Sequence, residues 1–168
     1  LYGQGPRALS KQLKIDAQTA RSYIDDYFLQ FPKVKNWMAK ILEEGRNHGY
    51  VETLWGRRRY IPELNMQNKM LQSFGERAAI NHPIQGTSAD MIKKAMIEID
   101  TAFREGDKDC KLILQVHDEL LFECTPEKLE EKARIIKEKM ESSIRLLVPV
   151  EVDLKTGKNW GEMTPLKI

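Results

Sequence analysis

The first third of the chain carries apolar residues at the three- and four-residue spacing of amphipathic helices. A short helix is predicted to begin at Pro6, because a proline is tolerated in a first helical turn. Asp16 is expected to cap a second helix, and Pro32 to begin a third helix that Gly45 and Gly49 end. The apolar faces consist of Ala20, Tyr23, Ile24, Tyr27, Phe28 and Phe31 in the second helix and Val34, Trp37, Met38, Ile41 and Leu42 in the third.

The pattern changes at residues 50–62, where β-branched and aromatic residues flank a glycine. This stretch predicts two short extended segments around a turn that displays Arg57, Arg58 and Arg59. Residues 66–82 are helical in composition. Pro83 lacks a backbone donor, so this helix is expected to end or kink there.

A further helix is predicted to begin at residues 87–90, Thr-Ser-Ala-Asp, which resemble a capping box. Its core stripe would be Ile92, Ala95, Met96, Ile99 and Phe103. Residues 111–116 and 119–124 then form two apolar strand candidates, which predict a hairpin with a carboxylate at its tip. A solvated helix over 126–145 and a strand over 150–154 complete a mixed α+β lobe, with an antiparallel sheet packed on helices.

Length and composition are those of a globular protein and do not indicate a membrane protein. The 168 residues are enough for one ordinary domain or two small lobes, and 41% hydrophobic with 31% charged residues is typical of globular proteins. No apolar run approaches the roughly 20 residues of a membrane span, so no membrane partner is expected. The first residues lack a secretory signal, which predicts a cytoplasmic protein, and the absence of an initiating Met predicts a trimmed chain.

Charge is distributed unevenly along the chain. The net charge of +2 is too small to indicate a nucleic-acid partner by itself. Residues 46–59, however, hold Arg46, Arg57, Arg58 and Arg59 beside a single acid, Glu52, and such a stretch can bind a polyanion. Cys110 and Cys124 lie at equal distances from His117 and could face each other across a hairpin; two reduced, buried thiols are expected rather than a disulfide or a metal site.

Two groups of polar residues are candidates for chemistry. His117, Asp118 and Glu119 stand between two runs that favour burial, although an aspartate in a turn is by itself more often a turn former than a ligand. Arg77, Asn81 and Gln85 recur every four residues and would share one helix face. Amide side chains suit base edges and arginine suits phosphate, but the spacing alone favours an ordinary solvated stripe.

Three separated blocks together resemble family A DNA polymerases, the bacterial polymerase I type. They are residues 1–3 with 9–10 (LYG and LS), residues 76–90 (ERAAINHPIQGTSAD) and residues 115–119 (QVHDE), and the likeness extends over residues 49–59 (GYVETLWGRRR). The resemblance covers the chain in order from end to end. It implies part of the fingers subdomain over residues 1–71 and the carboxyl-terminal part of the palm subdomain over residues 72–168.

The resemblance also implies roles for individual residues. Asp118 would be one of two catalytic aspartates that hold two Mg²⁺ ions, and Glu119 a supporting catalytic group. His117 would contact the primer end, and Arg77, Asn81 and Gln85 would line the minor groove of the new duplex. The remaining DNA contacts would be Tyr2 beside the nascent base pair and Arg57, Arg58 and Arg59 at template phosphates, with a solvated turn as the alternative for the arginines.

The family's first catalytic aspartate and its triphosphate-binding Lys and Arg are expected in a preceding, missing amino-terminal part of the polymerase. The implied partners are therefore primer-template DNA, deoxynucleoside triphosphates and that missing part, in a cytoplasmic, nucleoid-associated setting. The chain alone is predicted to be inactive. A catalytically inert DNA-binding fragment is the alternative, and an unrelated metal-dependent phosphohydrolase built around Asp118 is a weaker one.

Overall fold

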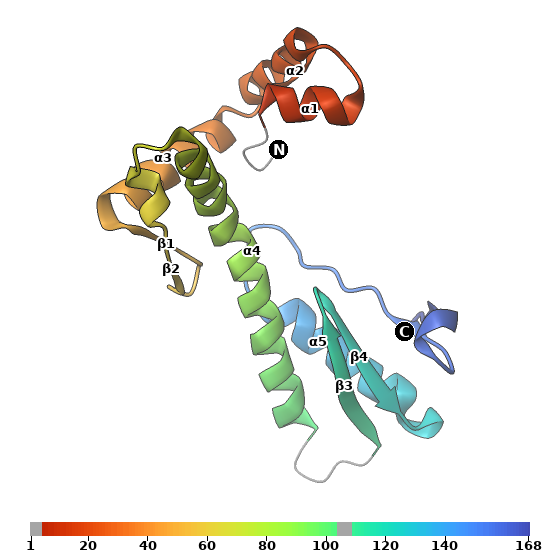
Figure 1. Cartoon of the computed structure of the whole chain (residues 1–168). Helices are drawn as coiled ribbons and strands as arrows, with labels where there is room; N and C mark the ends of the chain where they lie inside the picture. Colours follow the sequence, from red (N-terminus) through yellow and green to blue (C-terminus); the bar gives the residue numbers. More distant parts are fainter. Residues whose placement is uncertain (1–4, 104–108) are drawn as a thin grey trace. The chain divides into compact units, whose positions relative to one another are not determined.

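The structure is a computed structural model that describes residues 5–103 and 109–168. The chain forms two compact units, residues 1–87 and 88–168 (Figure 1). The first unit holds α1 (Pro6–Leu13), α2 (Ala17–Gln30), α3 (Pro32–His48), β1 (Tyr50–Glu52), β2 (Arg58–Tyr60) and the 3₁₀ turn η1 (Pro62–Asn65). The predicted subdomain boundary between residues 71 and 72 stays a prediction.

The three predicted helices of the first unit are confirmed, and so are two of their ends. The Asp16 carboxylate accepts hydrogen bonds from the backbone N–H groups of Gln18 at 2.8 Å and Thr19 at 2.9 Å, and these contacts hold its pKa below the ordinary value. Gly49 ends α3 in the left-handed conformation with φ of 77°, which glycine adopts without steric cost. Gly45 lies inside the helix instead of ending it.

The predicted extended pair at residues 50–62 is an antiparallel hairpin, in which Tyr50 pairs with Tyr60 and Glu52 with Arg58. Behind it lies a small core made of Val51, Ile61, Leu64 and Ala79, with Ile41, Leu42 and Ala78 packed around it. Apolar burial thus ties β1 and the end of β2 to α3 and to the helix that follows.

That helix, α4, runs without interruption over Lys69–Ala102, so the predicted end at Pro83 and the new start at Thr87 are wrong, while a kink at Pro83 stays a prediction. The Thr87 hydroxyl caps no helix; it donates to the Pro83 carbonyl oxygen at 2.5 Å and accepts from the backbone N–H of Leu54 at 3.0 Å. A proline inside a helix removes one hydrogen bond. The apolar contacts along α4 evidently outweigh that loss, since Ala79, Ala95 and other α4 residues are buried.

The second unit contains the remaining part of α4, the hairpin of β3 (Cys110–Val116) and β4 (Glu119–Cys124), the 3₁₀ turn η2 (Pro126–Lys128) and α5 (Leu129–Ser142) (Figure 1). The hairpin is confirmed, with Val116 opposite Glu119 and a β-bulge between Leu112 and Leu114. Its core consists of Ile99, Phe103, Cys110 and Ile136, lined by Leu120, Phe122, Cys124, Ile135 and Met140. The strands therefore pack on helices, as an α+β lobe requires.

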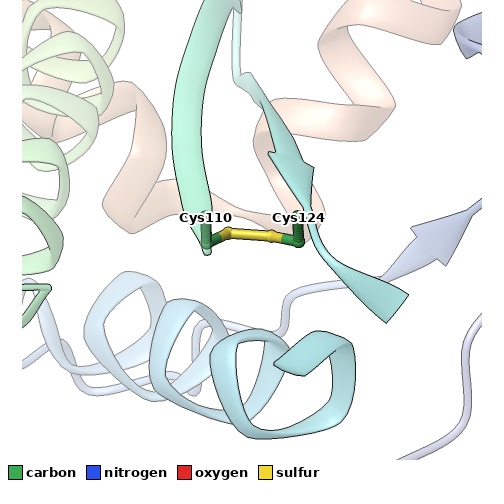
Figure 2. The surroundings of a disulfide bond; sticks show 2 residues. All are labelled: Cys110 and Cys124. Carbon is green, nitrogen blue, oxygen red and sulfur yellow. A yellow bond between two sulfur atoms is a disulfide. The ribbon is translucent and has the colours of Figure 1, made fainter. Parts of the chain in front are cut away.

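The prediction of two reduced thiols is wrong, because the structure joins Cys110 and Cys124 in a disulfide (Figure 2). These two residues are directly opposite each other in the β3–β4 register. Opposed residues of an antiparallel pair place their side chains on the same face and next to each other. The bond closes the base of the hairpin, at the end remote from His117.

The predicted strand over residues 150–154 is also wrong. This segment has no regular secondary structure; the Val152 N–H donates to the Glu141 carboxylate at 3.0 Å, and the Leu154 carbonyl accepts from the Leu166 N–H at 2.8 Å. A strand needs a partner ladder, and pairing begins only afterwards, where β5 (Lys155–Thr156) meets β6 (Thr164–Pro165) around the 3₁₀ turn η3 (Trp160–Glu162).

The fold is of the α+β class, as predicted. Within residues 5–103 and 109–168, no helix combines the length and the apolar content that crossing a membrane needs.

Candidate active site and nucleic-acid contacts

The tip of the β3–β4 hairpin presents three polar side chains to solvent. His117 and Asp118 form its two-residue turn, and Glu119 is the first residue of β4; all three are exposed. His117 has a φ of 53°, and among the described residues other than glycine only Lys14 shares a positive φ. The Gln115 side-chain amide donates to the His117 carbonyl oxygen at 2.7 Å, which supports the turn from within the hairpin.

This geometry places a carboxylate where a metal ion or substrate can reach it. Asp118 is the last residue of the turn, and Glu119 follows it as the first residue of β4. Within the described residues no three His, Cys, Asp or Glu side chains gather into a metal site. Asp118 fits the oxygen chemistry of Mg²⁺ as one ligand, but these residues do not complete a site for two ions.

The continuous helix α4 brings Arg77, Asn81 and Gln85 onto one face, at intervals of four residues. Arg77 and Gln85 are exposed and Asn81 is half-buried. Within the described part of the chain, the Asn81 Oδ1 is buried without a hydrogen-bond partner. A buried polar atom left unpaired calls for a functional or structural explanation, and a donor from a bound molecule would provide one.

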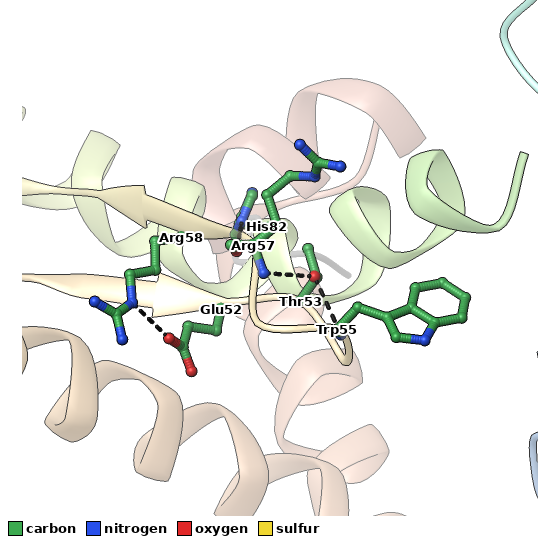
Figure 3. Close-up of polar contacts among 6 residues, drawn as sticks. All are labelled: Glu52, Thr53, Trp55, Arg57, Arg58 and His82. Atoms are coloured by element: carbon green, nitrogen blue, oxygen red, sulfur yellow. Dashed lines mark hydrogen bonds and ion pairs between the residues drawn. The ribbon is translucent and has the colours of Figure 1, made fainter. Parts of the chain in front are cut away.

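The loop between β1 and β2 is held by side chains that sequence reasoning did not identify as functional (Figure 3). The Thr53 hydroxyl accepts from the backbone N–H groups of Trp55 at 3.3 Å and Arg57 at 3.1 Å. The His82 Nε2 lies 3.1 Å from the Arg57 carbonyl oxygen, and Thr87 binds the Leu54 N–H. A threonine opening a glycine turn is the sequence signal that identifies Thr53 in retrospect.

Close approach of this loop to α4 depends on Gly86. A Cβ atom there would lie 2.6 Å from the Thr53 Cγ2 and 3.0 Å from the His82 Cε1. Real side chains do not approach so closely, so only glycine permits this packing. The packing of the β1–β2 loop against α4 therefore explains by itself why a glycine stands at position 86.

The three arginines of the hairpin are not equivalent. Arg58 donates to the Glu52 carboxylate at 2.8 Å (Figure 3). Its guanidinium carbon also lies 4.5 Å from the centre of the Tyr50 ring, a cation–π contact. The hydrogen bond to Glu52 is the main reason why the pKa of Arg58 is raised, and Tyr50 adds to it. Arg57 and Arg59 are exposed. Tyr2, the remaining predicted contact, lies outside the described residues.

The family model of DNA polymerase family A matches residues 1–162. The chain belongs to DNA polymerase family A. This family A chain is 47% identical over 160 residues to the thermostable DNA polymerase I of Thermus thermophilus and 44% identical over 162 residues to the DNA polymerase I of Streptococcus pneumoniae. The matches cover 95% and 96% of the chain. It spans about a fifth of the length of these relatives, 19% and 18%.

A solved structure shares the fold of this family A chain. The POL domain of Pol1 from M. smegmatis, in complex with DNA primer-template and dNTP, superposes with a TM-score of 0.85 at 40% sequence identity. The match covers 89% of this chain and 26% of that one. The resemblance identified from the three sequence blocks is therefore confirmed.

Proposed function

We propose that this family A chain takes part in template-directed DNA synthesis, supplying one catalytic carboxylate and part of the DNA-binding surface. The reaction joins the primer 3′-hydroxyl oxygen to the α-phosphorus of a deoxynucleoside triphosphate, while the bond to the pyrophosphate leaving group breaks. The observation that carries the proposal is the exposed Asp118 at a hairpin tip, within the QVHDE block of a family A chain. A cytoplasmic, nucleoid-associated location belongs to the same proposal.

Asp118 is the proposed metal ligand, and His117 the proposed contact to the primer end. Mg²⁺ is usually held by one or two carboxylates together with waters and substrate phosphates, so one exposed aspartate suits part of its coordination. When bound, such ions activate the attacking hydroxyl and offset charge on the leaving oxygens. Glu119, the first residue of β4, would support Asp118 by hydrogen bonding or charge.

The face of α4 that carries Arg77, Asn81 and Gln85 is the proposed minor-groove contact. Minor-groove acceptors lie at similar positions in all four base pairs, so donors there test pair geometry without reading sequence. In this role the Asn81 Nδ2 amide would be the donor, whereas its unpaired Oδ1 is an acceptor that could pair only with a donor such as the guanine amino group. Arg57, Arg58 and Arg59 are proposed phosphate contacts on the template strand, and Tyr2 a stacking contact beside the nascent pair.

We further propose that the chain by itself does not synthesise DNA. The supporting observation is that its described residues gather no cluster of three metal-binding side chains. The same observation favours the alternative of an inert DNA-binding module. Its membership of family A leaves no place for an unrelated phosphohydrolase.

Primer extension with Mg²⁺ and the four deoxynucleotides tests both readings. The chain is assayed alone, and then mixed with an amino-terminal fragment of a related polymerase that supplies the partner groups. Synthesis in the mixture only, and its loss in Asp118→Asn, is the expected result. Silence in both assays with DNA binding retained would support the inert module, and synthesis by the chain alone would contradict the predicted inactivity.

A further inference from the structure

The loop between β1 and β2 exposes two large apolar side chains beside the arginines. The Leu54 side chain is 68% exposed and that of Trp55 is 45% exposed, and both follow the buried Thr53. Large apolar residues gathered on a surface next to polar ones commonly mark a binding site. The three arginines of the same hairpin and Glu52 leave a net charge of +2 on it, so the fitting ligand is an anion.

The loop that carries Trp55 is already ordered in the structure. The Leu54 N–H donates to the Thr87 hydroxyl at 3.0 Å, and the Trp55 N–H donates to the Thr53 hydroxyl at 3.3 Å. At the other end of the loop, the His82 ring contacts the Arg57 carbonyl oxygen. A ligand that binds such a loop does not bear the entropy cost of ordering it. The loop therefore has the properties of a preorganised contact surface.

The side chains on this loop project in separate directions. Figure 3 shows the Trp55 indole extending from the loop away from the Glu52–Arg58 pair, and the Arg57 side chain rising from the other end of the loop. Exposed aromatic rings next to cations are the usual platform for single-stranded nucleic acid, where rings stack on bases and arginines hold phosphates. Bases inside a duplex are already stacked, so a ring can reach their faces only at the cost of unstacking them.

We propose that Trp55 stacks on an unpaired base of single-stranded DNA, while Arg57 and Arg59 bind the flanking phosphates. This inference rests on the proposed DNA binding of the chain and adds a residue and a strand type to it. Stacking of this kind is tolerant of sequence, because every base has a π face. The site would therefore hold an unpaired strand without selecting its bases.

The first test is fluorescence anisotropy of a labelled thymidine oligonucleotide titrated with the whole chain and its variants. Trp55→Ala is expected to weaken binding about ten-fold, and Trp55→Phe to retain most of the affinity because it keeps a ring. Trp160→Ala is the matched control, since the Trp160 side chain is 52% exposed but lies in the second unit, and its affinity should equal that of the unchanged chain. Binding to a blunt duplex should change little in Trp55→Ala.

The salt dependence separates stacking from charge. Trp55→Ala should leave the slope of log affinity against log salt unchanged, whereas Arg57→Gln should lower it by about one, the value of one phosphate contact. Tryptophan fluorescence is a second readout that does not need the alanine variant to fold. Saturating oligonucleotide should quench the emission of the unchanged chain, and the quenching should disappear in Trp55→Phe.

Three results would overturn the inference. Full affinity in Trp55→Ala, with weakened binding in Arg57→Gln, would remove the stacking contact and leave the proposed DNA binding intact. No binding of any DNA by the unchanged chain at low salt would remove both. Loss of self-association in Trp55→Ala by sedimentation, with unchanged DNA affinity, would identify Trp55 as a protein contact.

Discussion

The two hairpins of this chain carry their candidate functional residues at the same place, the tip, but stabilise that tip differently. The β1–β2 loop is fixed from outside the hairpin, by His82 and Thr87 of α4. The β3–β4 turn is supported by the hairpin itself, through the amide of Gln115, and its base is closed by a disulfide. One tip depends on tertiary contacts, and the other depends on its own ladder.

The difference in support matches a difference in chemistry. Arginine and tryptophan side chains bind phosphates and bases directly, so a surface of the β1–β2 kind is complete once its backbone is held. A single carboxylate such as Asp118 does little until further oxygen ligands surround a metal ion. The comparison predicts that the proposed DNA binding and the proposed catalysis can be separated, because substitutions in the two hairpins should have distinct effects.

The largest expected effect is on synthesis, from Asp118→Asn. In the primer-extension mixture described above, the rate should fall about a thousand-fold, because metal-assisted stabilisation is worth several kcal/mol and each 1.4 kcal/mol is about ten-fold in rate. Glu119→Gln is the matched control and should cost about 10- to 100-fold, as for supporting groups. Both variants should bind primer-template as the unchanged chain does. Equal losses of synthesis in the two variants would contradict the assignment of Asp118, and not Glu119, as the metal ligand.

The next effect is on stability, from reducing the disulfide at the base of β3–β4. The two cysteines are 14 residues apart, and closing a loop of about 15 residues contributes roughly 3 kcal/mol to the free energy of unfolding. Urea unfolding with and without dithiothreitol measures this difference. A variant carrying both Cys110→Ser and Cys124→Ser is the control, and its unfolding curves with and without dithiothreitol should coincide. Identical curves for the unchanged chain with and without dithiothreitol would mean that no disulfide forms, as the sequence had predicted.

The third effect concerns the support of the β1–β2 loop, through Thr87→Val. Valine keeps the shape of threonine but leaves the Leu54 N–H without its acceptor, and the loss of this part-buried hydrogen bond should cost about 0.5–1.5 kcal/mol of unfolding free energy. Thr87→Ser keeps the hydroxyl and should lose much less.

The matched control for Thr87 is Thr101→Val, on the same helix. The Thr101 hydroxyl also donates to the carbonyl four residues earlier, at 2.8 Å, but it is exposed and its removal should change stability little. Equal losses at both positions in urea unfolding would show that the loop does not depend on α4.

Elements with strong local signals could be predicted from the sequence. The helix caps at Asp16 and Gly49, and the turn at His117 and Asp118, depend on neighbouring residues alone, and all of them are confirmed. Residues 76–90 and 115–119 identified the family for the same reason, since a motif is a local string.

The errors lie where distant contacts decide. The sequence around Thr87 is typical of a helix cap, but in the structure its hydroxyl binds the Leu54 N–H of the β1–β2 loop. The helix α4 continues through Pro83 and Thr87. Residues 150–154 alternate like a strand, yet pairing requires a second strand that the pattern cannot supply. The support of the β1–β2 loop by His82 could not be predicted either, because the two segments are 25 residues apart in the chain.

The smallest expected effect is on DNA affinity, from Glu52→Gln in the β1–β2 hairpin. The Glu52 carboxylate holds the Arg58 guanidinium at 2.8 Å, so neutralising it removes a negative charge and releases a cation for phosphate. Affinity for single-stranded DNA should rise about two- to five-fold, with a steeper salt dependence. Contact with Glu52 raises the pKa of Arg58, and the stabilisation this gives is present below the ordinary guanidinium pKa and lost only as pH rises through the raised value. The gain should therefore be constant between about pH 6 and 9.

The control for this change is Glu44→Gln, which breaks a comparable exposed pair with Lys40 at 3.6 Å on α3, outside the arginine hairpin. Its effect on affinity should be smaller, because a charge farther from the bound strand is screened by salt. Equal gains from both variants would mean that only net charge matters and that Arg58 has no contact of its own with DNA. A gain in Glu52→Gln alone would support Arg58 as one of the proposed phosphate contacts of the β1–β2 hairpin, independently of Asp118.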